Sequence, residues 1–156
     1  MHPAHNMPPA GIAAQADNHS DDGAMAALPA LPLVELITSL RILIVEDDAM
    51  IGWLLGDMLE LMGHKVSAIE TTEDGAVAAA ARYTPDMMIV DAQLRVGSGL
   101  AAVERILRDR FVPHVFVTGD LRGVRKLRPS AVVIAKPFTE AGLVEAMKSA
   151  REAARS

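Results

Sequence analysis

The chain has 156 residues and a formal net charge of −5, with 51% apolar and 22% charged residues. These values suit one domain with a substantial core, and the length is too short for two ordinary domains. The absence of cysteine excludes disulfide scaffolds, thiol catalysis and thiolate metal sites. The negative charge disfavours binding to nucleic acids or anionic membranes.

The first 39 residues differ in composition from the rest of the chain. They contain five of the nine prolines and four acidic residues, but no lysine or arginine. We expect residues 1–39 to form an N-terminal extension that is disordered through about residue 27. The apolar segment Leu31–Leu40 is a candidate for a short helix. No segment has the length and apolarity of a membrane span or the pattern of a signal peptide, so a cytoplasmic protein is expected.

From Arg41 onward, short β-branched runs alternate with segments of helical periodicity. Residues 119–130 are expected to form a basic link without a regular helix, because they contain Gly123 and Pro129. The expected strands are 41–46, 64–69, 86–90, 113–118 and 131–135, and the expected helices are 48–62, 72–82, 99–110 and 139–153.

This alternation predicts an α/β fold over residues 40–156. Strands joined by short helical crossovers form a parallel sheet with helices on both faces. A five-stranded doubly wound sheet of this kind has the flavodoxin-like order 2-1-3-4-5, and its ligands bind at the carboxyl ends of strands 1 and 3.

Polar residues stand where four of these strands end. Glu46 and Asp47 follow the first strand, and Asp91 follows the third. Thr118 ends the fourth strand and Lys136 follows the fifth. Several carboxylates in one crevice need a counter-charge, and Mg²⁺ prefers oxygen ligands. Together with a lysine and a hydroxyl, such a site suits a phosphoryl group, and one carboxylate would act as the nucleophile.

These segments resemble the receiver domain of two-component response regulators, the chemotaxis-regulator-like fold. The resemblance rests on five motifs and covers residues 41 to about 153. The motifs are ILIVEDD at 42–48, PDMMIVD at 85–91, Gly99-Leu100, VTGD at 117–120 and KPF at 136–138.

The resemblance implies a role for each residue of the site. Asp91 would accept a phosphoryl group from a histidine kinase or a phosphotransfer protein. Thr118 and Lys136 would contact that group, and the Lys136-Pro137 peptide would be cis. Mg²⁺ would be held by Glu46, Asp47, Asp91 and the backbone carbonyl of Gln93. Asp48 is interpreted first as a helix cap. The chain would be a signalling protein, not an enzyme acting on a diffusible substrate.

The sequence departs from the family pattern in three places. Arg95 stands where a proline is common, and Val133 replaces the usual aromatic residue that couples to the threonine. The segment 122–128 carries four basic residues, which suggests either a solvated face or a contact surface for an acidic partner. Segments 114–120 and 128–138 resemble receivers of general-stress-response regulators. Because the sequence ends after the last helix, a single-domain adaptor, shuttle or phosphate sink is expected.

Two alternatives compete with this hypothesis. A receiver fold can serve as a phosphorylation-independent interaction module, and Val133 keeps that option open. Residues 97–102 also fit G-x-G-x-x-A, a dinucleotide-binding pattern. However, six residues separate Gly97 from the end of the third strand at Val90, whereas the pattern needs a tight turn directly after the first strand.

Overall fold

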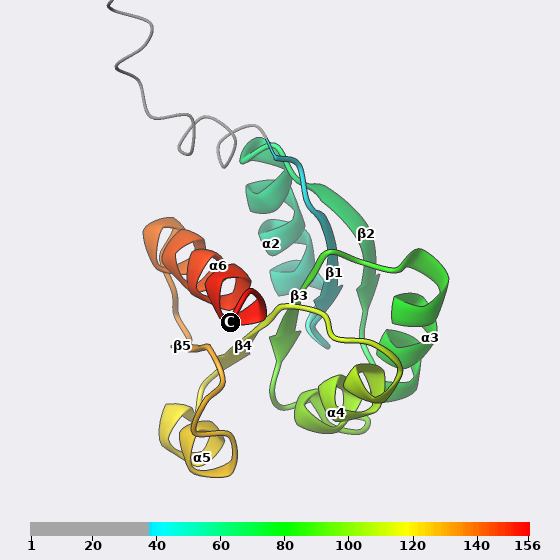
Figure 1. Cartoon of the computed structure of the whole chain (residues 1–156), viewed down its shortest axis with the longest axis vertical. Helices are drawn as coiled ribbons and strands as arrows, with labels where there is room; N and C mark the ends of the chain where they lie inside the picture. The colour runs from blue at the N-terminus through cyan, green and yellow to red at the C-terminus, as the bar shows by residue number, and fades with distance from the viewer. Residues whose placement is uncertain (1–37) are drawn as a thin grey trace, which may run out of the picture. The chain divides into compact units, whose positions relative to one another are not determined.

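The structure, a computed structural model, describes residues 38–156. The expected extension over 1–39 therefore lies almost entirely outside the described residues. Five strands and five helices alternate along the chain (Figure 1). The strands are β1 (Arg41–Val45), β2 (Lys65–Glu70), β3 (Met87–Asp91), β4 (His114–Thr118) and β5 (Val133–Ala135). The helices are α2 (Ala49–Leu61), α3 (Glu73–Tyr83), α4 (Gly99–Asp109), α5 (Leu121–Leu127) and α6 (Glu140–Ala154).

All strand pairs are parallel and their order is β2-β1-β3-β4-β5. The predicted fold class and strand order are therefore confirmed. Because β1 pairs with β2 on one side and with β3 on the other, and β2 lies at the edge, the chain reverses its direction of winding between β1 and β3. The carboxyl ends of these two strands consequently border the crevice where an open α/β sheet binds its ligands.

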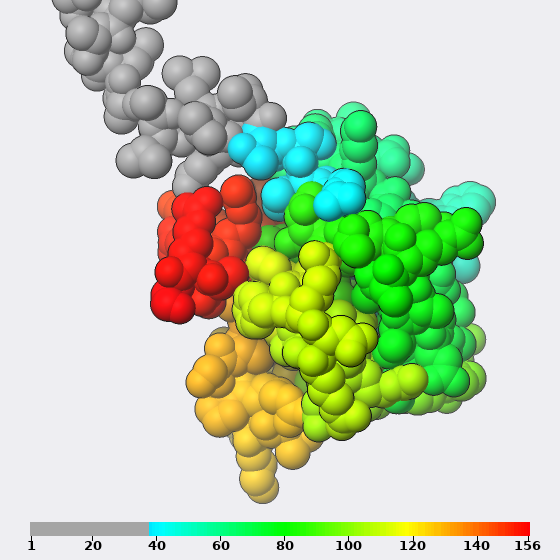
Figure 2. All heavy atoms as spheres, turned by 45° about the vertical axis from the view of Figure 1, so that its right-hand side comes forward, coloured from blue at the N-terminus to red at the C-terminus, as the bar shows by residue number. Residues whose placement is uncertain are grey.

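Two apolar clusters cover the two faces of the sheet. Successive side chains of a strand point to opposite faces, so Ile42 and Ile44 join one cluster while Leu43 and Val45 join the other. The first cluster packs under α2 and α6 through residues such as Leu59. The second packs under α3, α4 and α5, which share one side of the molecule in Figure 2. The central strands are buried on both faces, which explains their continuous apolar runs.

The expectation of no regular helix between β4 and β5 was wrong. Residues 121–127 form α5, and the Asp120 side chain caps it by accepting a hydrogen bond from the Gly123 N–H at 3.0 Å. A Cβ atom at Gly123 would overlap this carboxylate, so the glycine that lowers helix propensity also makes room for the cap. Val124 anchors the helix in the core, and Pro129 falls beyond its end.

Candidate functional site

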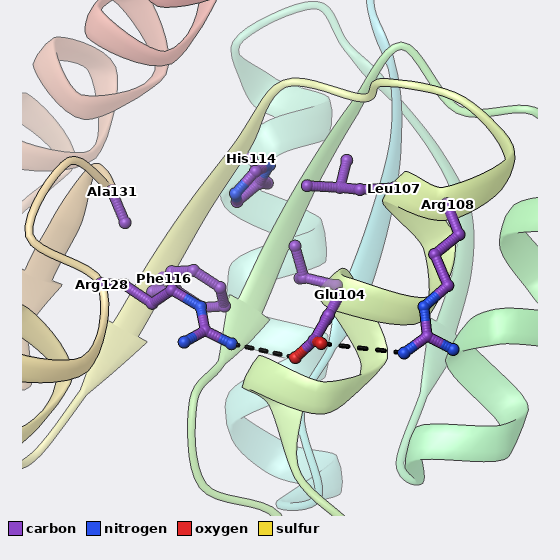
Figure 3. Close-up of a pocket in the computed structure, with 8 residues that line it drawn as sticks. Glu104, Leu107, Arg108, His114, Phe116, Arg128 and Ala131 are labelled. Carbon is purple, nitrogen blue, oxygen red and sulfur yellow. Dashed lines mark hydrogen bonds and ion pairs between the residues drawn. The ribbon is translucent and has the colours of Figure 1, made fainter.

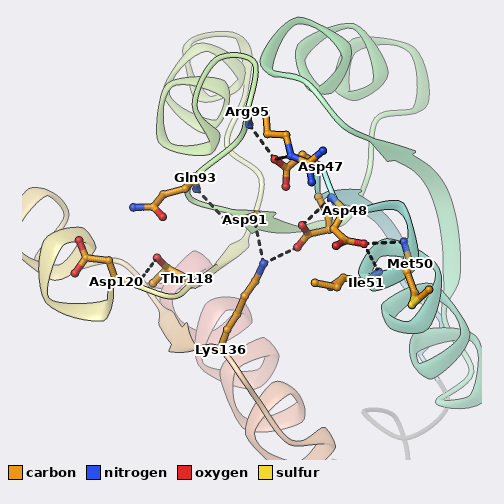
Figure 4. Close-up of polar contacts among 11 residues, drawn as sticks. Asp47, Asp48, Met50, Ile51, Asp91, Gln93, Arg95, Thr118, Asp120 and Lys136 are labelled. Atoms are coloured by element: carbon orange, nitrogen blue, oxygen red, sulfur yellow. Dashed lines mark hydrogen bonds and ion pairs between the residues drawn. The ribbon is translucent and has the colours of Figure 1, made fainter.

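Lys136 joins two carboxylates at the carboxyl ends of the central strands (Figure 4). Its Nζ atom lies 2.8 Å from Oε2 of Glu46 and 2.8 Å from Oδ2 of Asp91. Glu46 directly follows β1 and Asp91 ends β3, and the two residues are only 4% and 8% exposed. Parallel strands bring their ends to one edge of the sheet, so residues 45 and 90 positions apart in the sequence meet here.

Asp47 and the loop after β3 complete the rim of this pocket. The backbone N–H of Arg95 donates to Oδ2 of Asp47 at 2.9 Å, and the Arg95 guanidinium nitrogen Nε lies 3.5 Å from the same oxygen. The backbone N–H of Gln93 donates to Oδ1 of Asp91 at 2.9 Å. Arg95, which the sequence marked only as a departure from the family pattern, therefore stands beside one of the expected metal ligands.

Glu46, Asp47 and Asp91 fit a divalent cation. One carboxylate oxygen from each lies within 4.8 Å of the others. An octahedral Mg²⁺ shell places neighbouring oxygens about 3 Å apart and opposite oxygens about 4 Å apart, so small side-chain movements would bring all three to one ion. Lys136 and the Arg95 guanidinium offset two of the three carboxylates, which leaves one negative charge in excess for a cation to offset.

The pKa values of two groups reflect this crowding. Burial raises the pKa of Glu46 above its ordinary value, and the hydrogen bonds from Lys136 and from the Asp48 N–H only partly offset that effect. Burial alone would lower the pKa of Lys136, but its hydrogen bonds to Asp91 and Glu46 outweigh it and raise the pKa. Lys136 is therefore charged at neutral pH.

Thr118 lies on the other side of Asp91, at the end of β4. Its side chain is completely buried, and its Oγ1 accepts a hydrogen bond from the Asp120 backbone N–H at 3.0 Å. As an acceptor in this bond, the hydroxyl retains its own hydrogen for donation. Asp120 is the cap of α5, so Thr118 connects the pocket to the start of that helix.

Asp48 caps α2, as its position after the acidic pair predicted. Its Oδ1 accepts hydrogen bonds from the N–H groups of Met50 and Ile51 at 3.0 and 3.2 Å. The carboxylate is therefore engaged with the helix, and its own backbone N–H donates to Oε1 of Glu46 at 3.1 Å. This backbone contact orients Glu46 toward Lys136.

Gly99 is a positioning residue whose role was not recognised from the sequence. A Cβ atom built on it would overlap the backbone carbonyl of Asp91, and its N–H donates to the Ala92 carbonyl at 3.1 Å. The first turn of α4 thus packs directly on the backbone of the central acid. The Gly-Leu pair was the available signal, but only the fold shows that glycine is required by this close approach.

The dinucleotide-like segment 97–102 is used for a different purpose. Its Ser98 side chain caps α4 by accepting from the Ala101 N–H. The Ser98 backbone N–H donates to Oε2 of Glu73 at 3.0 Å, and a Cβ atom at Gly97 would overlap the Glu73 side chain. A carboxylate thus occupies a backbone donor that a bound pyrophosphate would need. This packing disfavours the nucleotide-binding alternative.

Two further expectations concern the elements around the pocket. The Lys136-Pro137 peptide is cis, as the resemblance implied. Val133 lies in β5 directly opposite Phe116 of β4, so an aliphatic side chain fills the place where an aromatic residue was expected from the family.

None of the helices formed by residues 38–156 is long and apolar enough to cross a membrane.

Comparison with protein families gives a match over most of this fold. Residues 42–148 match the response regulator receiver domain, a range that includes the four strand ends described above. The chain is 37% identical over 107 residues to the phyllosphere-induced regulator PhyR of Methylorubrum extorquens. The aligned region covers 66% of this chain and 40% of that protein. The chain spans less than two thirds of the length of the curated relatives it matches.

Solved structures give the same result. The solution structure of the receiver domain of PhyR from Erythrobacter litoralis has a TM-score of 0.67 at 32% identity, and the match covers 73% of this chain and 91% of that one. The anti-anti-sigma factor PhyR from Bartonella quintana has a TM-score of 0.65 at 29% identity, covering 81% of this chain and 54% of that one.

Proposed function

Because the chain belongs to the family of response regulator receiver domains, we propose that Asp91 accepts a phosphoryl group from a histidine kinase or a phosphotransfer protein. The observation that carries this proposal is the placement of Asp91. It ends the central strand at the switch point and contacts Lys136, and the Glu46 and Asp47 carboxylates lie within reach of the same cation. Receivers of this kind are signalling proteins whose chemistry is their own phosphorylation.

In the proposed reaction, a carboxylate oxygen of Asp91 attacks the phosphorus of the donor. The bond between phosphorus and the donor's imidazole nitrogen breaks, the electron pair leaves with the imidazole, and an acyl phosphate forms. Attack by water later restores the carboxylate and releases inorganic phosphate. Lys136 holds one oxygen of Asp91 and offers its positive charge to the incoming phosphoryl oxygens.

We further propose that Glu46, Asp47 and Asp91 hold Mg²⁺, with the backbone carbonyl of Gln93 as an additional ligand. When bound, this ion supplies positive charge that offsets the carboxylates and the phosphoryl oxygens. The support is the oxygen donor set and its 4.8 Å span. The exposed Arg95 side chain would move away from Asp47 as the ion binds, because the two cations compete for one carboxylate.

Phosphorylation of Asp91 would act on α5 through Thr118. Its buried hydroxyl can donate to a phosphoryl oxygen, and any rotation toward Asp91 weakens the bond it now accepts from the Asp120 N–H. That bond lies at the cap of α5, so the helix start would loosen or shift. This route does not depend on an aromatic residue at position 133.

The exposed start of α2 is the proposed docking surface for the phosphodonor. Met50, Trp53 and Leu54 are 73%, 73% and 63% exposed, and they lie on the first turns of the helix that follows Glu46 and Asp47. Aromatic and aliphatic anchors of this kind are typical of interface hot spots. A donor bound there would be close to the mouth of the pocket.

The downstream role that we propose is an adaptor, shuttle or phosphate sink that works through protein contacts in a stress response. Its support is the similarity to PhyR proteins, one of which is described as an anti-anti-sigma factor. A phosphorylation-independent interaction module is the second candidate, which the replacement of the usual aromatic by Val133 keeps open.

The proposal is tested with acetyl phosphate and MgCl₂ followed by intact-mass measurement. We expect the full chain to gain the mass of one phosphoryl group, and peptide mapping to place it on Asp91. Asp91→Asn should remove the gain, whereas Asp109→Asn, an exposed aspartate at the end of α4, should not. Labelling that persists in Asp91→Asn would contradict the assignment, and no labelling of the native chain would favour the second candidate.

A further inference from the structure

A cavity of about 280 Å³ opens between α4 and the segment that follows α5 (Figure 3). Its apolar wall is formed by Val103 and Leu107 of α4, Phe116 of β4 and Ala131, and the His114 ring lies edge-on to Phe116 with ring centroids 5.3 Å apart. The cavity is separate from the acidic pocket, since none of the residues of that pocket lines it. It offers space for one large apolar side chain.

The rim of this cavity is positively charged. Glu104 lies between two arginines, with its carboxylate 3.1 Å from Arg128 and 3.7 Å from Arg108 (Figure 3). One carboxylate between two guanidinium groups leaves a net charge of plus one. The ion pair with Arg128 also ties the end of α5 to α4, and Figure 2 shows these two helices side by side on one face.

α5 adds three more cations beside this rim. Arg122, Arg125 and Lys126 are exposed, and none of them forms an ion pair with the residues at 38–156. Arg125 and Lys126 lie in the last turn of α5, and Arg128 is the C-cap residue that directly follows that helix. Leu127, on the same helix, is 61% exposed. The chain as a whole carries a net charge of −5, so this local excess of positive charge is not a property of the entire surface.

We propose that the groove between α4 and α5 binds an acidic amphipathic segment of a partner protein. One large apolar side chain of the partner enters the cavity, and its flanking carboxylates pair with Arg125 and Arg122. Charge complementarity selects this occupant, because an unpaired row of cations beside an apolar cavity favours acidic groups flanking an apolar anchor. The binding needs no phosphorylation of Asp91, so it stands apart from the proposed phosphoryl transfer.

The test uses a fluorescein-labelled 14-residue peptide with leucines at helical spacing and glutamates at the other positions, titrated with the full chain and followed by anisotropy. A second peptide carries glutamine in place of every glutamate. We expect the acidic peptide to bind at least tenfold more tightly than the glutamine peptide. Amide chemical-shift changes in the labelled protein should cluster on α4, α5 and the residues that line the cavity.

Three variants separate charge from cavity. Arg122→Glu combined with Arg125→Glu should weaken binding at least tenfold; Arg128 is kept, because it holds Glu104. Ala131→Leu fills the cavity without changing charge and should weaken binding several-fold. Lys65→Glu reverses a single charge on the edge strand β2, half the change in the double variant, and should leave binding unchanged. Circular dichroism of each variant verifies the fold.

Several results would overturn the proposal. One is equal weakening by Lys65→Glu, which would indicate unspecific attraction. Another is tighter binding of a single-stranded DNA oligonucleotide of similar length, which would indicate a nucleic-acid surface. A third is self-association in sedimentation velocity that the α5 variants abolish, which would assign the groove to a second copy. Because the assay does not involve Asp91, its failure would leave the phosphoacceptor proposal intact, and Asp91→Asn should bind the peptide normally.

Discussion

The Nζ atom of Lys136 lies 2.8 Å from a carboxylate oxygen of Asp91, and the same nitrogen lies 2.8 Å from Glu46. One ammonium group thus bridges two buried acids, one directly after β1 and one at the end of β3, and offsets one of their two negative charges. Without it, the two carboxylates would repel each other in a poorly solvated site. The charge of Lys136 therefore has a structural role as well as the proposed chemical one.

Lys136→Ala should retain the fold but lower the free energy of unfolding by about 2 kcal/mol, because it leaves two buried carboxylates without their counter-ion. The partial exposure of Lys136 keeps the effect below that of a fully buried pair. Urea unfolding measures this loss, and Mg²⁺ should restore part of it. Phosphorylation by acetyl phosphate should also slow, whereas Lys148→Ala, an exposed change on α6, should alter neither quantity. Unchanged kinetics in Lys136→Ala would argue against its role.

Asp47→Asn should weaken Mg²⁺ binding by at least tenfold, because it replaces one of three converging carboxylates by a neutral amide. A ligand that binds only the folded state stabilises it, so MgCl₂ should raise the melting temperature of the native chain. The rise should be much smaller in Asp47→Asn and unchanged in Asp109→Asn. If both variants respond to MgCl₂ as the native chain does, the ion is not bound by Asp47.

Gly99→Ala should destabilise the protein by about 1–3 kcal/mol, because the new methyl group overlaps the Asp91 carbonyl and forces the backbone to shift. The shift would also displace the Asp91 side chain and reduce its phosphorylation. Gly119→Ala is the matched control, since a Cβ atom at Gly119 meets no other group within 4 Å. Equal stability of the two variants in urea would show that α4 can relax away from β3 at no cost.

Trp53→Ala should slow phosphoryl transfer from a histidine kinase by about tenfold or more, as expected for loss of an aromatic interface anchor. Labelling by acetyl phosphate, which needs no docking surface, should be unchanged. Leu61→Ala removes a side chain that is 90% exposed near the far end of α2 and should have little effect on either reaction. If Trp53→Ala slows phosphorylation equally with the kinase and with acetyl phosphate as donor, the defect lies in the pocket and not in the docking surface. Trp53 is the only tryptophan in the chain, so its fluorescence also reports binding of the donor.

The unfolding free energy should depend on two histidines below pH 6.5. The pKa values of His64 and His114 are lowered, in both cases mainly by burial. The unfolded chain therefore binds protons that the folded chain resists, and stability falls as the pH drops from about 6.5 toward the lower folded pKa.

Comparison with His114→Asn isolates one of these contributions. Asparagine can keep a donor toward the Val112 carbonyl, which His114 Nδ1 contacts at 2.8 Å, but it does not titrate. The raised pKa of Glu46 acts in the opposite direction, since its contribution is lost as the pH rises above 4.5. The native chain and His114→Asn share the Glu46 effect, so it cancels in the difference between their unfolding free energies. If the pH dependence of the unfolding free energy is unchanged in His114→Asn, the His114 ring takes up protons equally in the folded and the unfolded chain.

The α/β alternation and the strand order followed from local patterns. Residues such as Ile42 and Met88 belong to short apolar runs typical of strands buried on both faces, and Asp48 and Thr72 mark helix starts. Both signals depend on near neighbours, which a single sequence displays. The motifs at the strand ends then indicated which residues to expect in one pocket.

The helix at 121–127 and the role of Gly99 were not predictable in the same way. Gly123 lowers helix propensity, yet in the folded chain it admits the Asp120 cap, and Val124 gains its stabilisation from core residues distant in sequence. Such tertiary contacts override local preference. The contact of Arg95 with Asp47 likewise depends on how the loop after β3 packs.

Sequence alone determined the order of elements, the buried runs and the identity of the acids and lysine at the strand ends, since periodicity and composition are local properties. The tertiary structure decided which oxygen atoms face Lys136, how closely α4 approaches Asp91 and where a cavity opens beside the cations of α5. These features arise from contacts between residues tens of positions apart, whose distances follow from strand register and side-chain packing and not from any local pattern.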